Sequence, residues 1–111
     1  MNLSLPPDFH VNVIADSLGI KTSAGREFLQ IALENALLMD RKQQDYGSKN
    51  ISSFGVFGVV VRMNDKFERI KNLFNNRRKR AVNESIRDSF RDVSNYAIIA
   101  LILEMGKWPE K

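Results

Sequence analysis

The sequence predicts a small all-α domain, and three observations support this prediction. Apolar residues recur at steps of three and four along three long segments, which is the period of an amphipathic helix. Glycines follow two of these segments, as they often do after helix ends. The length of 111 residues suits one domain with a modest core. We therefore expect one domain over residues 1–111, a small helical bundle of three main helices plus a short N-terminal helix, completed by oligomerisation.

The first half of the chain contains one short and one long predicted helix. Residues 8–18 form the short one, because Pro7 suits a first helical turn and Gly19 follows as a stop. The pair Thr22-Ser23 is predicted to cap the next helix, which runs over residues 24–45. Its apolar positions are Phe28, Ile31, Ala32, Leu38 and Met39.

The second half begins with a predicted loop over residues 47–58, where three glycines and three serines gather. A third helix follows and ends at Asn75-Asn76. Its apolar positions step by three and four: Val60, Met63, Phe67, Ile70 and Phe74. After a basic turn over residues 77–80, the last helix spans residues 82–105. Its apolar stripe is Val82, Ile86, Phe90, Val93 and Ala97.

Composition limits the possible chemistry. The chain has no cysteine, which removes disulfides, thiolate catalysis and cysteine-bound zinc. The single histidine, His10, lies far in sequence from the other candidate groups. A net charge of +4 favours phosphate-bearing partners. Residues 1–7 do not resemble a signal peptide, and the longest apolar run, 97–103, is too short for a bilayer. We predict a cytoplasmic protein without a membrane partner.

Acidic and amide side chains line one face of the last predicted helix. They follow one another at steps of four, four and three: Glu84, Asp88, Asp92 and Asn95. The same face continues into Ile99 and Ile102, so we expect another helix or a second subunit to cover it. Carboxylates at the edge of a covered face repel one another unless a cation neutralises them, and oxygen-rich clusters suit Mg²⁺ or Mn²⁺.

A second acidic pair, Asp65 and Glu68, lies on the preceding helix. It can belong to a metal site, or it can form ordinary surface pairs with Arg62 and Arg69 along the helix. Lys66 and Arg69 are the better candidates for phosphate contacts because a helix fixes them, whereas the basic turn at 77–80 fits a solvated surface.

Several motifs occur here in a recognisable order. They are Lys42-x-x-Asp45-Tyr46-Gly47, Phe54-Gly55, Arg62-x-x-Asp65-Lys66-x-x-Arg69 and Glu84-Ser85-x-x-Asp88-x-x-x-Asp92-x-x-Asn95. Together they resemble the nucleotide modification associated domain of phages and bacteria, over about residues 30–105. That domain is similar to the MazG-type all-α pyrophosphatases, which are oligomers and bind Mg²⁺ through two acidic pairs. The cell implied is a bacterium or a phage-infected host.

The resemblance implies roles for individual residues. The catalytic set is Asp65, Glu68, Asp88 and Asp92, and Glu84 joins these four as a ligand of Mg²⁺ or Mn²⁺. The set that contacts the substrate is Lys42, Asp45, Tyr46, Lys66, Arg69 and Asn95. The implied reaction splits a nucleoside triphosphate into monophosphate and pyrophosphate.

Two other functions remain open from the sequence. The MazG-type enzymes have Glu where this chain has Asp65, and their second acidic pair is spaced by three residues rather than four. A non-catalytic protein that sequesters nucleotides therefore stays an alternative. Residues 15–20 also resemble the turn of a helix-turn-helix, although Gly25 stands where a β-branched residue is usual. Binding of duplex DNA is possible but not favoured.

Overall fold

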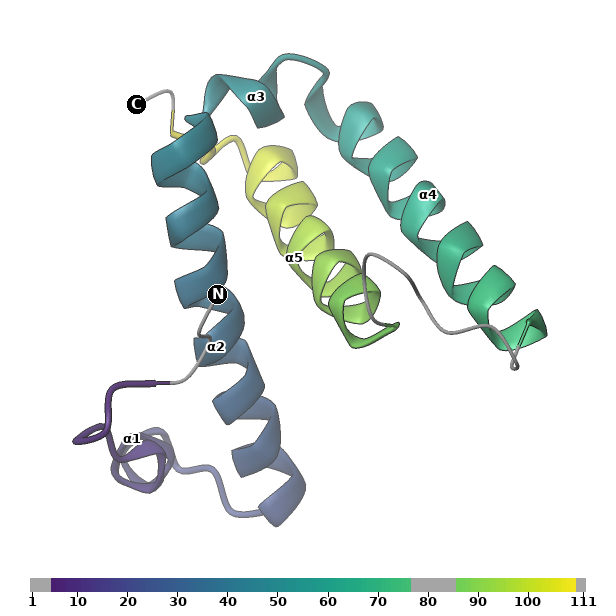
Figure 1. Ribbon diagram of the computed structural model, residues 1–111. Coiled ribbons are helices and arrows are strands. Elements are labelled where there is room, and N and C mark those ends of the chain that lie inside the picture. The colour runs from purple at the N-terminus through teal and green to yellow at the C-terminus, as the bar shows by residue number, and fades with distance from the viewer. Residues whose placement is uncertain (1–4, 77–85, 110–111) are drawn as a thin grey trace. The chain divides into compact units, whose positions relative to one another are not determined.

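The computed structural model describes residues 5–76 and 86–109 and confirms the all-α class (Figure 1). The described residues form helices and no strand. The helices are α1 (Val11–Leu18), α2 (Ser23–Tyr46), α3 (Lys49–Ser52), α4 (Gly55–Asn75) and α5 (Ile86–Glu104). None of them has a stretch both long and apolar enough to cross a bilayer.

Several helix ends agree with the predictions. The Gly25 N–H donates a 2.9 Å hydrogen bond to Thr22 Oγ1, which confirms the cap of α2. Gly47 follows α2 with a φ of 76°, in the left-handed region that glycine adopts most easily. Asn76 caps the end of α4. The predicted first helix is too long, because residues 8–10 precede α1 and the Phe9 N–H instead closes a turn on the Pro6 carbonyl.

The predicted loop over residues 47–58 is mostly helical. It contains α3 and the first turn of α4, which begins at Gly55. Gly58 shows why glycine misled the prediction. Its N–H donates to the Phe54 carbonyl, and a Cβ at Gly58 would overlap the Phe54 Cβ. Glycine at this position allows a close approach inside a helix and does not break it.

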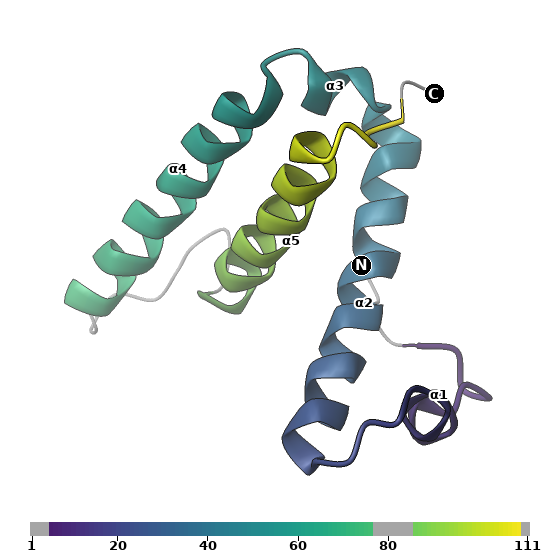
Figure 2. The ribbon, with the colours of Figure 1, turned by 180° about the vertical axis from the view of Figure 1, so that it is seen from behind.

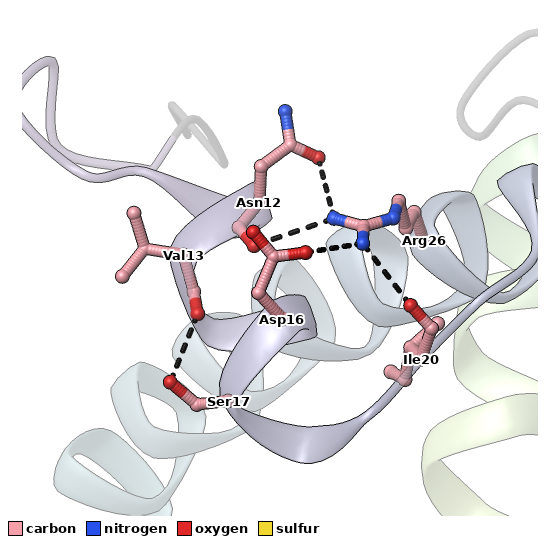
Figure 3. A network of polar contacts seen from close by, with 6 residues as sticks. All are labelled: Asn12, Val13, Asp16, Ser17, Ile20 and Arg26. Carbon is pink, nitrogen blue, oxygen red and sulfur yellow. Dashed lines mark hydrogen bonds and ion pairs between the residues drawn. The ribbon is translucent and has the colours of Figure 1, made fainter.

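The chain divides into two compact units, residues 1–44 and 45–111, and each is described by itself. In the first, α1 ends in a turn in which the Ile20 N–H bonds to the Ala15 carbonyl and the Gly19 N–H to the Asp16 carbonyl. Arg26 on α2 closes this corner (Figure 3), since its guanidinium donates to Asn12, Asp16 and the Ile20 carbonyl. The single-domain assignment stays a prediction.

In the second unit α4 and α5 lie side by side and run antiparallel, as Figures 1 and 2 both show. The ion pair between Lys66 Nζ and Asp92 Oδ2, at 2.8 Å, fixes which residues lie at the same level. Two turns further along, the same register places Val59 level with Ile99, and these side chains are only 1% and 2% exposed. Burying each contributes about 1.5–3 kcal/mol. We call this α4–α5 interface the seam.

The seam corrects the predicted apolar stripes. Val60, Phe67 and Phe74 of α4 are about half exposed, and so is Phe90 of α5. The α4 residues that are buried or half-buried toward α5 are instead Val56, Val59, Met63, Lys66, Ile70 and Leu73. On α5 they include Ser89, Asp92, Tyr96, Ile99 and Leu103. Both rows step by three and four, so the period was predicted correctly. Met63 and Ile70 of the predicted α4 stripe belong to the seam, whereas its other three members and Phe90 of α5 face outward.

The covered face of the last helix is confirmed. Asn95 is 8% exposed and Ile99 is 2% exposed. Ile102 is half-buried. From the sequence we expected either another helix or a second subunit to cover this face. The structure shows the first arrangement, because α4 of the same chain packs against α5. Val82 and Glu84, which begin the predicted stripes, lie outside the described residues.

Candidate functional site

The seam has an apolar half and a charged half. The apolar half contains Val59 and Ile99. The charged half is the end nearer the start of α5, and we define it by Lys66, Arg69, Asp88, Ser89, Asp92 and Asn95. Ser89 is fully buried there and Asn95 almost so. Hydroxyl, amide and ionic groups thus occupy positions that hydrocarbon side chains normally fill in a helix pair.

The Lys66–Asp92 pair is the centre of the charged half. The side chains are 22% and 13% exposed, so water screens their 2.8 Å contact only weakly. A half-buried ion pair gives little net stability over a well-packed apolar pair, because both ions lose hydration. Proteins that keep such groups in a core often use them for function. Because the chain keeps this ion pair in spite of the lost hydration, the charged half is the strongest candidate site.

The structure separates the remaining predicted catalytic residues. Asp65 is exposed on α4. Glu68 pairs with Lys71 at 3.0 Å on the outer surface, where both side chains are more than 60% exposed. Asp88 is exposed in the first turn of α5, one turn before Asp92. Of these four carboxylates, Asp92 is the one that is largely buried in the seam, whereas Asp88 lies exposed at the edge of its charged half.

The predicted substrate contacts fall into two groups. Lys66, Arg69 and Asn95 belong to the charged half of the seam, where Arg69 is half-buried. Asp45 and Tyr46 are exposed at the end of α2. Lys42 is half-buried on α2 and belongs to the first compact unit, whereas the other predicted substrate contacts belong to the second. The basic turn at 77–80 lies outside the described residues.

A metal centre needs several ligands at one point, and the described residues do not supply them. Across residues 5–76 and 86–109, no three acidic or histidine side chains gather closely enough to hold an ion. Asp92 is also already paired with an ammonium group. The donor set of the described residues therefore does not fit Mg²⁺ on its own. Glu84, the fifth predicted ligand, lies outside them.

Ser89 and the Lys66–Asp92 contact were not predicted from the sequence. A signal for them does exist, because Ser89, Asp92, Tyr96 and Ile99 follow the spacing of a helix–helix seam. Polar residues at such positions indicate a polar interface. Which α4 residue meets Asp92 depends on the register between the helices, and the spacing does not give that register.

Fold and site together define a small helical protein with an ionic pair inside a two-helix seam. The family model for nucleotide modification associated domain 1 matches residues 42–103, which is more than half of the chain. This chain belongs to that family, and both helices of the seam lie almost wholly inside the match. No curated protein and no solved structure matches the chain. The similarity to MazG-type pyrophosphatases stays a prediction.

Proposed function

We propose that this protein binds nucleotides through the charged half of the seam, in nucleotide metabolism or DNA modification. The observation that carries the proposal is the ion pair of Lys66 and Asp92, held between α4 and α5 beside buried Ser89 and Asn95. The family match covers all four residues. Family membership supports nucleotides as the ligand class, and the net charge of +4 is compatible with them.

Cationic side chains supply the contacts that the phosphate groups of a nucleotide need. Lys66 and Arg69 are the donors for phosphate oxygens, since ionic hydrogen bonds to phosphate are among the strongest that side chains make. Tyr46 and Phe54 are 69% and 74% exposed, but both precede α4 and therefore belong to the other end of the seam from Lys66 and Arg69. Arg69 is held half-buried on α4, so binding costs it less side-chain entropy than it costs a free surface arginine.

Binding is tested by titrating canonical and modified nucleotides in the presence of EDTA, with calorimetry or a fluorescent analogue. We expect saturable binding that Arg69→Ala weakens about tenfold or more. Lys71→Ala is the matched control, because Lys71 pairs with Glu68 on the outer surface and should leave the affinity unchanged. A folded protein that binds no nucleotide in these titrations would refute the proposal.

Metal-dependent pyrophosphohydrolysis is the second candidate, and one observation favours it. Asp88 and Asp92 stand one turn apart on α5, so both carboxylates could contribute to holding one metal ion against a phosphate group. Mg²⁺ or Mn²⁺ would enter this site only with ligands in addition to the described residues. Adding either ion to the nucleotides and measuring pyrophosphate tests the candidate. Release that disappears in both Asp88→Ala and Asp92→Ala would establish an enzyme.

Duplex DNA stays a less favoured alternative. Gly25, which stood against a helix-turn-helix, packs closely in this corner, because a Cβ there would lie 2.8 Å from Ile20 Cγ2. The corner between α1 and α2 is therefore built around glycine. This alternative would be favoured if the protein bound duplex DNA in a salt-dependent way and did not bind free nucleotides.

We propose a second copy of the chain as the protein partner. Five apolar side chains on the outer side of α4 are between 45% and 78% exposed: Phe57, Val60, Val61, Phe67 and Phe74. Several large apolar side chains exposed along one side of a helix are typical of an interaction site.

A further inference from the structure

Lys66 stands where a seam of two helices normally has an apolar residue. It lies between Met63 and Ile70 in the row of α4 residues that faces α5, one turn from each. Its ammonium group is 2.8 Å from Asp92, and the two side chains are 22% and 13% exposed. Keeping both ions from water costs solvation free energy that an apolar pair would not lose. The packing of α4 against α5 therefore does not explain why an ion pair stands at this position.

The two charges balance without any further ion. Lys66 contributes one positive charge and Asp92 one negative charge, and their buried neighbours Ser89 and Asn95 are neutral. Arg69 and Asp88, the other ionic members of the charged half, add one charge of each sign. A divalent cation bound to Asp92 would lie beside the ammonium group, and cations repel strongly at such a distance in a half-buried site. No three acidic or histidine side chains of the described ranges gather to offset this repulsion.

We propose that Lys66 is the built-in counter-ion of Asp92 and takes the place of the divalent cation that the family resemblance implies at this carboxylate. The ammonium group neutralises Asp92 and donates a hydrogen bond to it, which are the tasks that an ion would perform in holding the charged half together. The proposal concerns the free protein, so it does not depend on nucleotide binding. The folded chain should then require no divalent cation at Asp92.

Thermal unfolding of the full chain with Mg²⁺, with Mn²⁺ and with EDTA tests this assignment. The wild-type Tm should be the same in all three. Lys66→Met should lower the Tm by about 5 °C or more in all three solutions, because Asp92 loses its counter-ion and the described donors are too few to hold a divalent cation in its place. The Tm of Lys66→Met/Asp92→Asn should be higher than that of Lys66→Met, and it should not change when Mn²⁺ is added. Lys71→Met, which breaks an exposed pair, is the control.

Two results would overturn the proposal. One is a saturable rise of the wild-type Tm with Mg²⁺ or Mn²⁺ that Asp92→Asn abolishes, since Asp92 would then hold an ion despite Lys66. The other is a folded Lys66→Met variant that unfolds at the same temperature as the wild type, since Asp92 would then not need Lys66. If Lys66→Met does not fold, the wild-type titration decides alone, and Lys66→Arg, which keeps the positive charge, should behave like the wild type.

Discussion

Gly25 shows how the absence of one methyl group shapes the first unit. A Cβ at this position would lie 2.8 Å from Ile20 Cγ2 and 3.0 Å from Thr22 Oγ1. Thr22 cannot retreat freely, because its hydroxyl caps α2 by accepting the Gly25 N–H. We expect Gly25→Ala to lower the free energy of unfolding by about 1–3 kcal/mol. Chemical denaturation of both proteins measures the difference.

A double variant provides the control for this prediction. Ile20→Ala removes the Cγ2 atom that the new methyl group would meet, so Ile20→Ala/Gly25→Ala should lose less stability than the two single losses combined. Alanine is by itself the better helix former by about 1 kcal/mol. If Gly25→Ala stabilised the protein, helix propensity would dominate and the close contact would be absent in solution.

At the scale of elements, α5 offers a matched pair of isoleucines. Ile99 is 2% exposed in the seam, whereas its neighbour Ile98 is 47% exposed. We expect Ile99→Ala to cost about 2–5 kcal/mol of unfolding free energy, because it leaves a cavity between α4 and α5. Ile98→Ala should cost under about 1 kcal/mol. Equal losses in denaturant titrations would show that α5 turns a different face inward.

The helices themselves were largely predictable from the sequence, because their period and caps are local properties. For α5 the sequence predicted that the face of Ile99 is covered, but it did not show that the face of Phe90 is exposed. This helix is apolar on the side of Phe90 and Leu101 and again on the side of Ile99 and Ile102, so periodicity alone leaves two candidate faces. The long-range contacts with α4 choose between them. Residues 47–58 were misread because Gly58 serves packing against Phe54 rather than a turn.

The candidate site was predictable in its residue types but not in its pairing. Carboxylates and cations on the two helices were identified, yet Lys66 and Asp92 are 26 positions apart, and only the helix register brings them together. Charge patterns along one helix cannot show that an aspartate already has a partner on another. For the same reason, acidic pairs spaced as in a metal site can remain apart in the folded chain.

At the scale of the whole molecule, α4 carries a second seam-like row on its outer side. Phe57, Val60, Asn64, Phe67, Lys71 and Phe74 step by three and four, as the residues of a coiled-coil seam do. The three phenylalanines are 78%, 47% and 53% exposed. They offer roughly 350 Å² of aromatic surface, a fair share of the ~800 Å² that each partner buries in a stable interface.

We expect this row to join two copies of the chain through their α4 helices. Phe67→Ser, at its centre, should shift the protein to a monomer in size-exclusion chromatography with light scattering, while its helical content is retained. Phe28→Ser on α2, which changes a still more exposed phenylalanine in the other unit, is the control. A wild-type protein that is monomeric at high micromolar concentration would contradict the expectation.

The chain contains one tryptophan, and its position gives the molecule an optical reporter. Trp108 follows α5, and its indole N–H donates a 3.0 Å hydrogen bond to the Ser48 carbonyl just before α3. Indole emission therefore responds to the opening of residues 45–111 alone, whereas circular dichroism records the helices of both units. Coincident melting curves from the two signals would mean that the whole chain unfolds together. Separated curves would mean that each unit melts by itself.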